Sequence, residues 1–193
     1  MSAGAATDGA GGTGAPTPSA TTPSAATAGA TTPSAPPPTV AELEQQHRDL
    51  RFPSFDLDDA WRLGTLIVEL ARERGLAVTV DLHHGEQQVF HAALPGTSAD
   101  NDDWIRRKAA VVRRFGEASY LVGERHRQWG RPFALDPSRY AAHGGSFPLL
   151  VHGTGPVGTV TVSGLPQLAD HQLVTECLAL FLTQRQDEER ERA

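Results

Sequence analysis

Apolar residues recur at helical spacing in several stretches of the chain. Between Asp56 and Gly75, apolar positions three or four residues apart predict a helix that Asp56 caps and Gly75 ends. Similar spacing predicts helices over residues 104–120 and 166–185, and a short polar helix is expected over 39–49. The helix after Asp56 is expected to bury one face, made of Trp61, Leu63, Leu66, Ile67 and Leu70.

Four stretches rich in β-branched residues predict two hairpins. The first joins residues 76–82 to 87–94 through a turn that contains Gly85, and the second joins 147–152 to 157–163. Hairpin strands lie antiparallel, and helices are expected before, between and after the two hairpins. The pattern therefore predicts an α+β domain, an antiparallel sheet flanked by helices.

The connections between these elements are less regular. The loop over residues 95–101 is expected to end in a helix cap at Asp100 or Asn101, because short polar side chains accept hydrogen bonds from first-turn amides. Residues 123–142 are rich in arginine and contain two prolines, Pro132 and Pro137. They are expected to be irregular, with one short helical turn.

Composition divides the chain into three parts. Residues 1–39 consist almost entirely of Ala, Thr, Pro, Gly and Ser, with Asp8 as their only charge, and such a segment buries too little apolar surface to fold. We expect a disordered tail there, a single domain over residues 40–186, and a charged end over 187–193.

Charge and cysteine content exclude several classes of protein. The formal net charge is −6, from 17 basic and 23 acidic residues, which argues against nucleic acid as a partner. A single cysteine, Cys177, excludes an internal disulfide framework. No apolar run is long enough to span a membrane, and the first residues lack the features of a secretory signal, so a cytoplasmic location is expected.

Two motifs resemble catalytic signatures without their required context. Residues 153–158 spell G-x-G-x-x-G, but a β-branched stretch follows them where a dinucleotide-binding loop needs a helix. A hairpin turn is expected instead. His143-Gly144-Gly145 is similar to an esterase oxyanion loop, yet no serine stands in a G-x-S-x-G elbow, and Ser163 lacks the first glycine.

Histidines provide no recognisable metal motif. His83, His84 and His91 lie on one predicted hairpin, but their spacing matches none of the paired patterns of zinc sites. No metal site is therefore predicted, and each of these side chains is expected to be solvated or hydrogen-bonded.

Two charged residues lie where apolar residues are expected. On a helical projection that starts at Trp104, the only lysine, Lys108, falls in the same arc as Val111, Val112 and Phe115. Asp170 falls in the apolar arc of the last helix, with Val174, Cys177, Leu178 and Phe181. An unpaired buried charge costs several kcal/mol. Three interpretations remain open: Lys108 extends to the helix edge, the two form a structural ion pair, or Lys108 binds an anionic ligand.

The glycine pair Gly144-Gly145 bears on the same question. Two glycines before a strand allow backbone conformations that other residues avoid, so their amides can converge on an anion or approach a ligand closely. A tight entry into the strand explains them equally well.

The segment over residues 144–174 resembles the haem-binding family that includes HbpS, GlcG and the C-terminal domain of PduO. The residues that match its pattern in order are Gly144, Gly145, Pro148, Val162, Ser163, Gly164 and Asp170, and the Lys108-Ala109 helix is also similar. The likeness extends over about residues 55–181. It implies a profilin-like or PAS-like sandwich that forms homo-oligomers, and it implies haem or corrinoid binding in some members, with slow oxidative haem breakdown.

Three functions follow as hypotheses. The first is a non-enzymatic domain that binds haem, a corrinoid or another anionic small molecule near Lys108 and Gly144-Gly145, with His91 or His143 as the haem ligand. The second is a haem-degrading enzyme, for which no spacing identifies an acid or base. The third is an assembly or accessory protein whose function lies in its oligomer surface.

Overall fold

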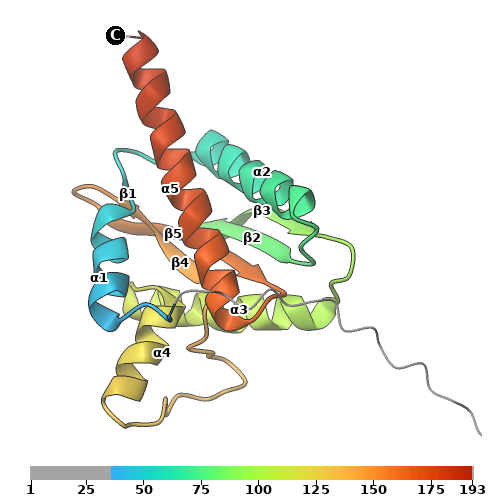
Figure 1. The fold of residues 1–193 in the computed structure, drawn as a ribbon, viewed down its shortest axis with the longest axis vertical. Coiled ribbons are helices and arrows are strands. Elements are labelled where there is room, and N and C mark those ends of the chain that lie inside the picture. Colours follow the sequence, from blue (N-terminus) through green and yellow to red (C-terminus); the bar gives the residue numbers. More distant parts are fainter. Residues whose placement is uncertain (1–35, 193) are drawn as a thin grey trace, which may run out of the picture. The chain divides into compact units, whose positions relative to one another are not determined.

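A computed structural model describes residues 36–192, which form five helices and five strands (Figure 1). In chain order these are α1 (Val40–Asp49), β1 (Arg51–Phe52), α2 (Leu57–Glu73), β2 (Thr79–His84), β3 (Gln87–Ala93), α3 (Ala99–Phe115), α4 (Ser119–Gln128), β4 (Ser146–Val151), β5 (Gly155–Ser163) and α5 (Gln167–Arg192). The predicted α+β class is confirmed. Most of the segment predicted to be a disordered tail, residues 1–35, lies outside the described residues.

The five strands form one sheet in the order β1-β4-β5-β2-β3. Both predicted hairpins are present, and β5 also pairs antiparallel with β2, so four of the strands form the expected antiparallel sheet. The short edge strand β1, which the sequence pattern did not indicate, pairs parallel with β4. The motif at residues 153–158 forms the β4–β5 turn and the start of β5, as expected of a hairpin.

The two faces of the sheet differ in polarity. One face carries Val80, Leu82, Val160 and Val162, and it packs against α2 and α5, which run beside each other (Figure 1). The other face, on which α3 packs, carries buried polar residues: Thr79, Asp81, Ser146, Thr159, Thr161 and Ser163. Buried polar groups require partners, so this second layer is where polar chemistry is concentrated.

Helix α2 differs from prediction in the residues that it buries. Trp61 is 64% exposed, whereas Leu63, Ile67 and Ala71 are fully buried. The buried arc is centred on these three positions at i, i+4 spacing, which turns Trp61 outward. Gly64 lies in the same arc, where a Cβ atom would be 2.4 Å from the ring of Phe90.

The segment after β3 also differs from prediction. Helix α3 begins at Ala99 with Ser98 as its N-cap, earlier than expected, and Asn101 accepts a hydrogen bond from the Ser98 amide. It ends at Phe115 because Gly116 adopts a left-handed φ of 68°. Phe115, at this end, is 40% exposed rather than buried. A separate helix, α4, follows. The sequence pattern instead predicted that α3 would continue to residue 120 and that an irregular segment with one short helical turn would follow.

The last helix is longer than predicted. α5 continues to Arg192 rather than ending near Arg185. Ion pairs one turn apart, such as Arg190 with Asp187, and a contact from Arg62 on α2 to Glu188 support this end. No helix within residues 36–192 is long and apolar enough to cross a membrane.

Candidate functional site

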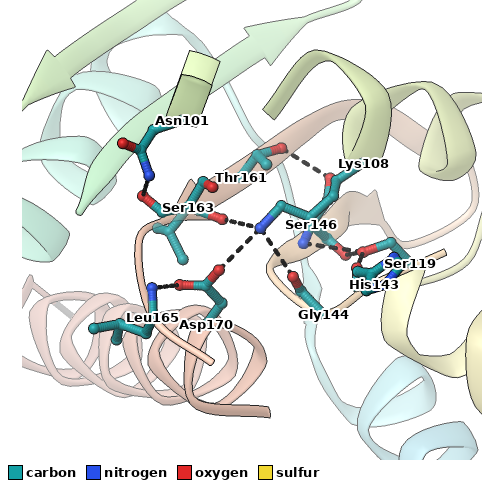
Figure 2. A network of polar contacts seen from close by, with 11 residues as sticks. Asn101, Lys108, Ser119, His143, Gly144, Ser146, Thr161, Ser163, Leu165 and Asp170 are labelled. Atoms are coloured by element: carbon teal, nitrogen blue, oxygen red, sulfur yellow. Dashed lines mark hydrogen bonds and ion pairs between the residues drawn. The ribbon is translucent and has the colours of Figure 1, made fainter. Parts of the chain in front are cut away.

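Lys108 and Asp170 meet between α3 and the start of α5. The Lys108 Nζ atom lies 2.9 Å from Asp170 Oδ2, and each residue is only 2% exposed (Figure 2). Nζ also donates hydrogen bonds to the carbonyl oxygens of Gly144 at 2.9 Å and Val162 at 2.7 Å. Because an ammonium has three N–H donors, this one is fully satisfied within the protein.

Asp170 is positioned by the turn before α5. Its Oδ1 atom accepts a hydrogen bond from the Leu165 amide at 3.0 Å, while Oδ2 faces Lys108. Burial raises the pKa of Asp170 above its usual value, although Lys108 and two backbone amides oppose this shift. Burial likewise lowers the pKa of Lys108, opposed by Asp170. Burial therefore disfavours the charged form of each side chain, and the opposite charge of its partner stabilises that form.

The glycine pair makes room for this ion pair. A Cβ atom on Gly145, whose φ is +116°, would lie 2.5 Å from the Val162 oxygen and 2.6 Å from Lys108 Nζ. A Cβ atom on Gly144 would lie 1.8 Å from the Gln167 oxygen. Gly145 is therefore required for close packing around Lys108, and Gly144 for close packing against the start of α5.

A cavity of about 280 Å³ opens above the ion pair, and we call it the polar cavity. Its walls come from α3, the loop before β4 and the turn that leads into α5, and include Asp100, Asn101, Trp104, His143, Gly144 and Gln167. Lys108 and Asp170 also contribute to its lining, although both are almost wholly buried. Polar side chains therefore lie around a floor whose charges are already paired.

A second cavity, of about 480 Å³, shares Trp104, His143 and Gln167 with the first. We call it the arginine cavity, because Arg107, Arg127 and Arg131 line it together with Phe133, Leu135, Pro132, Pro137 and Tyr140. No Asp or Glu is among its lining residues in the part of the chain that the structure describes. Its size falls in the usual range of small-molecule sites, about 300–1,000 Å³.

The three arginines differ in how they are held. Arg107 packs over the ring of Trp104 at 4.1 Å, and its Nε atom pairs with Asp103 at 2.8 Å. Arg127 pairs with Glu124, one turn earlier on α4. Arg131 forms no ion pair with any residue from 36 to 192. Apolar walls with positive charge at several points suit a flat ligand that carries anionic groups.

His143 lies where the two cavities meet. Its ring packs edge-on against Trp104, with centroids 5.2 Å apart, and its backbone carbonyl accepts a hydrogen bond from Ser119 (Figure 2). Partial burial lowers the pKa of His143, and the nearby charges of Lys108, Arg127 and Arg107 lower it further. The neutral imidazole that results is the form that binds metals.

The structure separates the sequence-predicted ligand residues into two groups. Lys108, Gly144 and His143 line the polar cavity, whereas Gly145 and His91 line neither cavity. Gly145 packs beside Lys108, and His91 lies on β3 with its ring between Asp81 and Asp102. Proximity in sequence did not predict this grouping, because Gly145 is adjacent to Gly144 and still lines neither cavity.

Sequence reasoning missed the residues that make the arginine cavity. Arg127, Arg131, Phe133 and Tyr140 all lie in the stretch that was expected to be irregular. The available signal was its density of arginines, the residue best suited to bind carboxylates and phosphates.

Known proteins similar to this chain share its described domain. The family model described as haem-degrading protein HbpS-like matches residues 55–179. A UPF0303 protein of Streptomyces coelicolor is 61% identical over 149 residues, which cover 75% of this chain and 94% of the relative. The crystal structure of the Ybr137w protein superposes with a TM-score of 0.70 at 29% identity, covering 76% of this chain and 88% of that one.

A more distant solved structure is described as the PduOC:heme complex. It superposes with a TM-score of 0.57 at 19% identity and covers 65% of this chain and 94% of its own. Identity at this level shows a common fold alone.

Proposed function

Because the chain belongs to the HbpS-like family of haem-degrading proteins, we propose that it binds haem in the arginine cavity, with His143 as the iron ligand. The observation that carries this proposal is the position of His143 at the edge of an apolar cavity that three arginines line. The family's name and the haem complex of a protein with the same fold support the choice of ligand.

The residues present fit the chemical groups of haem. Phe133, Leu135 and Pro132 offer apolar contact to the macrocycle, and Arg127 and Arg131 offer paired N–H donors to its two propionates. Trp104, which Arg107 holds in place, packs against His143 and limits the orientations of its ring. Bound haem would supply an iron centre capable of redox chemistry.

Lys108 and Gly144 have an indirect part in this proposal. Their contacts join α3, β5 and the start of α5 below His143, so they hold the loop that carries this histidine. The Lys108 ammonium has no free donor for a propionate, and the arginines take that role.

The test is a titration of the full chain with haemin, with the Soret absorbance as the readout. We expect a shifted Soret band and one haem per chain, with affinity reduced at least about tenfold by His143→Ala. His152→Ala, in the β4–β5 turn, is the matched control and should bind normally. Haemin that keeps its free spectrum, or equal effects of the two variants, would refute the assignment of the site.

The same samples distinguish binding from catalysis. A Soret band that persists under ascorbate and oxygen indicates a binding domain, whereas its loss with release of iron indicates the haem-degrading enzyme. A corrinoid added in place of haemin tests the other ligand that the family resemblance implies.

The proposal includes self-association. Trp61 and Leu57 on α2 are 64% and 54% exposed, which leaves apolar surface on the side of the domain away from the cavities. Light scattering after size exclusion should give a mass above that of one chain. A monomer would remove the assembly hypothesis and leave the haem proposal intact.

A further inference from the structure

A buried carboxylate on β2 has no lysine or arginine partner among the described residues. Asp81 is 1% exposed in the middle of the sheet, and only histidines form ion-pair contacts with it among residues 36–192. Its Oδ1 atom accepts a hydrogen bond from Gln88. Its Oδ2 atom lies 2.8 Å from His83 Nδ1, yet neither of these atoms has an aligned hydrogen-bond partner. A buried carboxylate without a compensating cation is costly.

Asp81 also orients the ring of His91. The Nδ1 atom of His91, directly across the β2–β3 pair, lies 3.3 Å from Asp81 Oδ1 within hydrogen-bond geometry. A proton on Nδ1 leaves Nε2 with its lone pair directed away from the sheet. This is the arrangement of most metal-binding histidines, whose second ring nitrogen donates to a carboxylate.

A second carboxylate lies on the open side of His91. Asp102, in the first turn of α3, places Oδ1 3.4 Å from His91 Nε2, which is longer than a good hydrogen bond. Two ligand atoms bonded at about 2.1 Å to a tetrahedral ion are about 3.4 Å apart. Both side chains are accessible, at 38% for His91 and 49% for Asp102.

We propose that His91 Nε2 and Asp102 Oδ1 bind a divalent transition-metal ion, with Asp81 as the positioning residue behind His91. His91 Nε2 and Asp102 Oδ1 lie at the separation expected of two ligands of one ion, and both side chains are open to solvent. The ion also strengthens the Nδ1–H donor toward Asp81, so its charge compensates the buried carboxylate through the imidazole ring.

The donor set defines the class of ion. One imidazole nitrogen and one carboxylate oxygen suit zinc, nickel or copper better than magnesium or calcium, which prefer oxygen alone. No group of three or more His, Cys, Asp or Glu side chains within the described range is spaced to hold a metal. The proposed site is therefore open, and water completes the coordination of the ion.

The experiment uses the full chain without an affinity tag or haem. Calorimetric titration with Zn²⁺ should give one site per chain. His91→Ala and Asp102→Asn should each weaken binding at least about tenfold, and Asp81→Asn about 10- to 100-fold. His152→Ala, an exposed histidine on a turn, should leave the affinity unchanged.

Electron paramagnetic resonance with Cu²⁺ separates positioning from general structural damage. The wild-type spectrum should show coupling to one imidazole nitrogen, which His91→Ala abolishes. Asp81→Asn should keep this nitrogen but alter the copper parameters. If Asp81→Asn fails to fold, by circular dichroism, the surface variant Asp102→Asn still decides the ligand set.

Two results would overturn the proposal. One is the absence of Zn²⁺ binding at millimolar concentration, and the other is a loss of binding in His152→Ala as large as in His91→Ala. The haemin titration is independent, because His91 and Asp102 line neither cavity. Failure of one site therefore leaves the other untouched.

Discussion

Replacing Lys108 with methionine tests the buried ion pair that joins α3 to α5. The substitution keeps most of the side chain's volume and removes its charge, leaving the carbonyls of Gly144 and Val162 and the carboxylate of Asp170 without their donor. Removing one partner of a buried pair costs about 3–5 kcal/mol. For a domain of this size, 1 kcal/mol changes Tm by about 2–4 °C, so a decrease of about 6–20 °C is expected.

The assay is urea unfolding at pH 7, monitored by circular dichroism. Arg113→Met, on the exposed face of the same helix, is the matched control and should change the unfolding free energy by less than about 0.5 kcal/mol. The double variant Lys108→Met/Asp170→Asn should be less destabilised than the sum of the single variants, because the two residues interact directly.

The result that would refute this reasoning is a loss below about 1 kcal/mol for Lys108→Met, or strict additivity with Asp170→Asn. Either would mean that the ammonium and the carboxylate do not depend on each other. The ion pair below the polar cavity would then contribute little to the stability of the fold.

Further predictions concern buried groups elsewhere. Burial lowers the pKa of His171 to about 4, so the neutral imidazole stabilises the fold fully above pH 6.5. The free energy of unfolding should therefore fall by about 3 kcal/mol as the pH decreases from 6.5 to 4. Urea unfolding at several pH values measures this, and a flat profile would contradict it. Gly145→Ala should cost at least about 2 kcal/mol through its contact with Val162, and more than Gly130→Ala, where no atom lies nearby. The Cys177 thiol, whose pKa burial raises to about 12, should react with a thiol reagent only as fast as the domain unfolds.

The pattern of apolar residues was sufficient for the main architecture. Strand alternation places Val80 and Val160 on one face and Asp81 and Thr161 on the other, and the two turns leave no room for a parallel arrangement of the hairpin strands. The helical projection placed Lys108 and Asp170 toward the interior, and both are buried. These are local consequences of period 2 and period 3.6, which a sequence carries directly.

Boundaries and edge elements were less predictable. Gly116 ends α3 because it adopts a left-handed conformation. A glycine inside a helical pattern does not by itself predict that the helix stops there. β1 has two residues, and only its pairing with β4 makes it a strand. Trp61 shows the same limit, since which side of a broad apolar arc is buried depends on the partner helix.

The sequence by itself determined the class of fold, the inward position of two opposite charges, and the family resemblance. Only the tertiary structure decided how those charges are used: it brings three acceptors to Lys108, so the ammonium is committed to the protein. It also placed His143 beside arginines of α4 and the following loop, and placed His91 against Asp102 of α3, outside both cavities. Such neighbours are far apart in the chain, and their approach depends on how helices pack on the sheet, which no local spacing encodes.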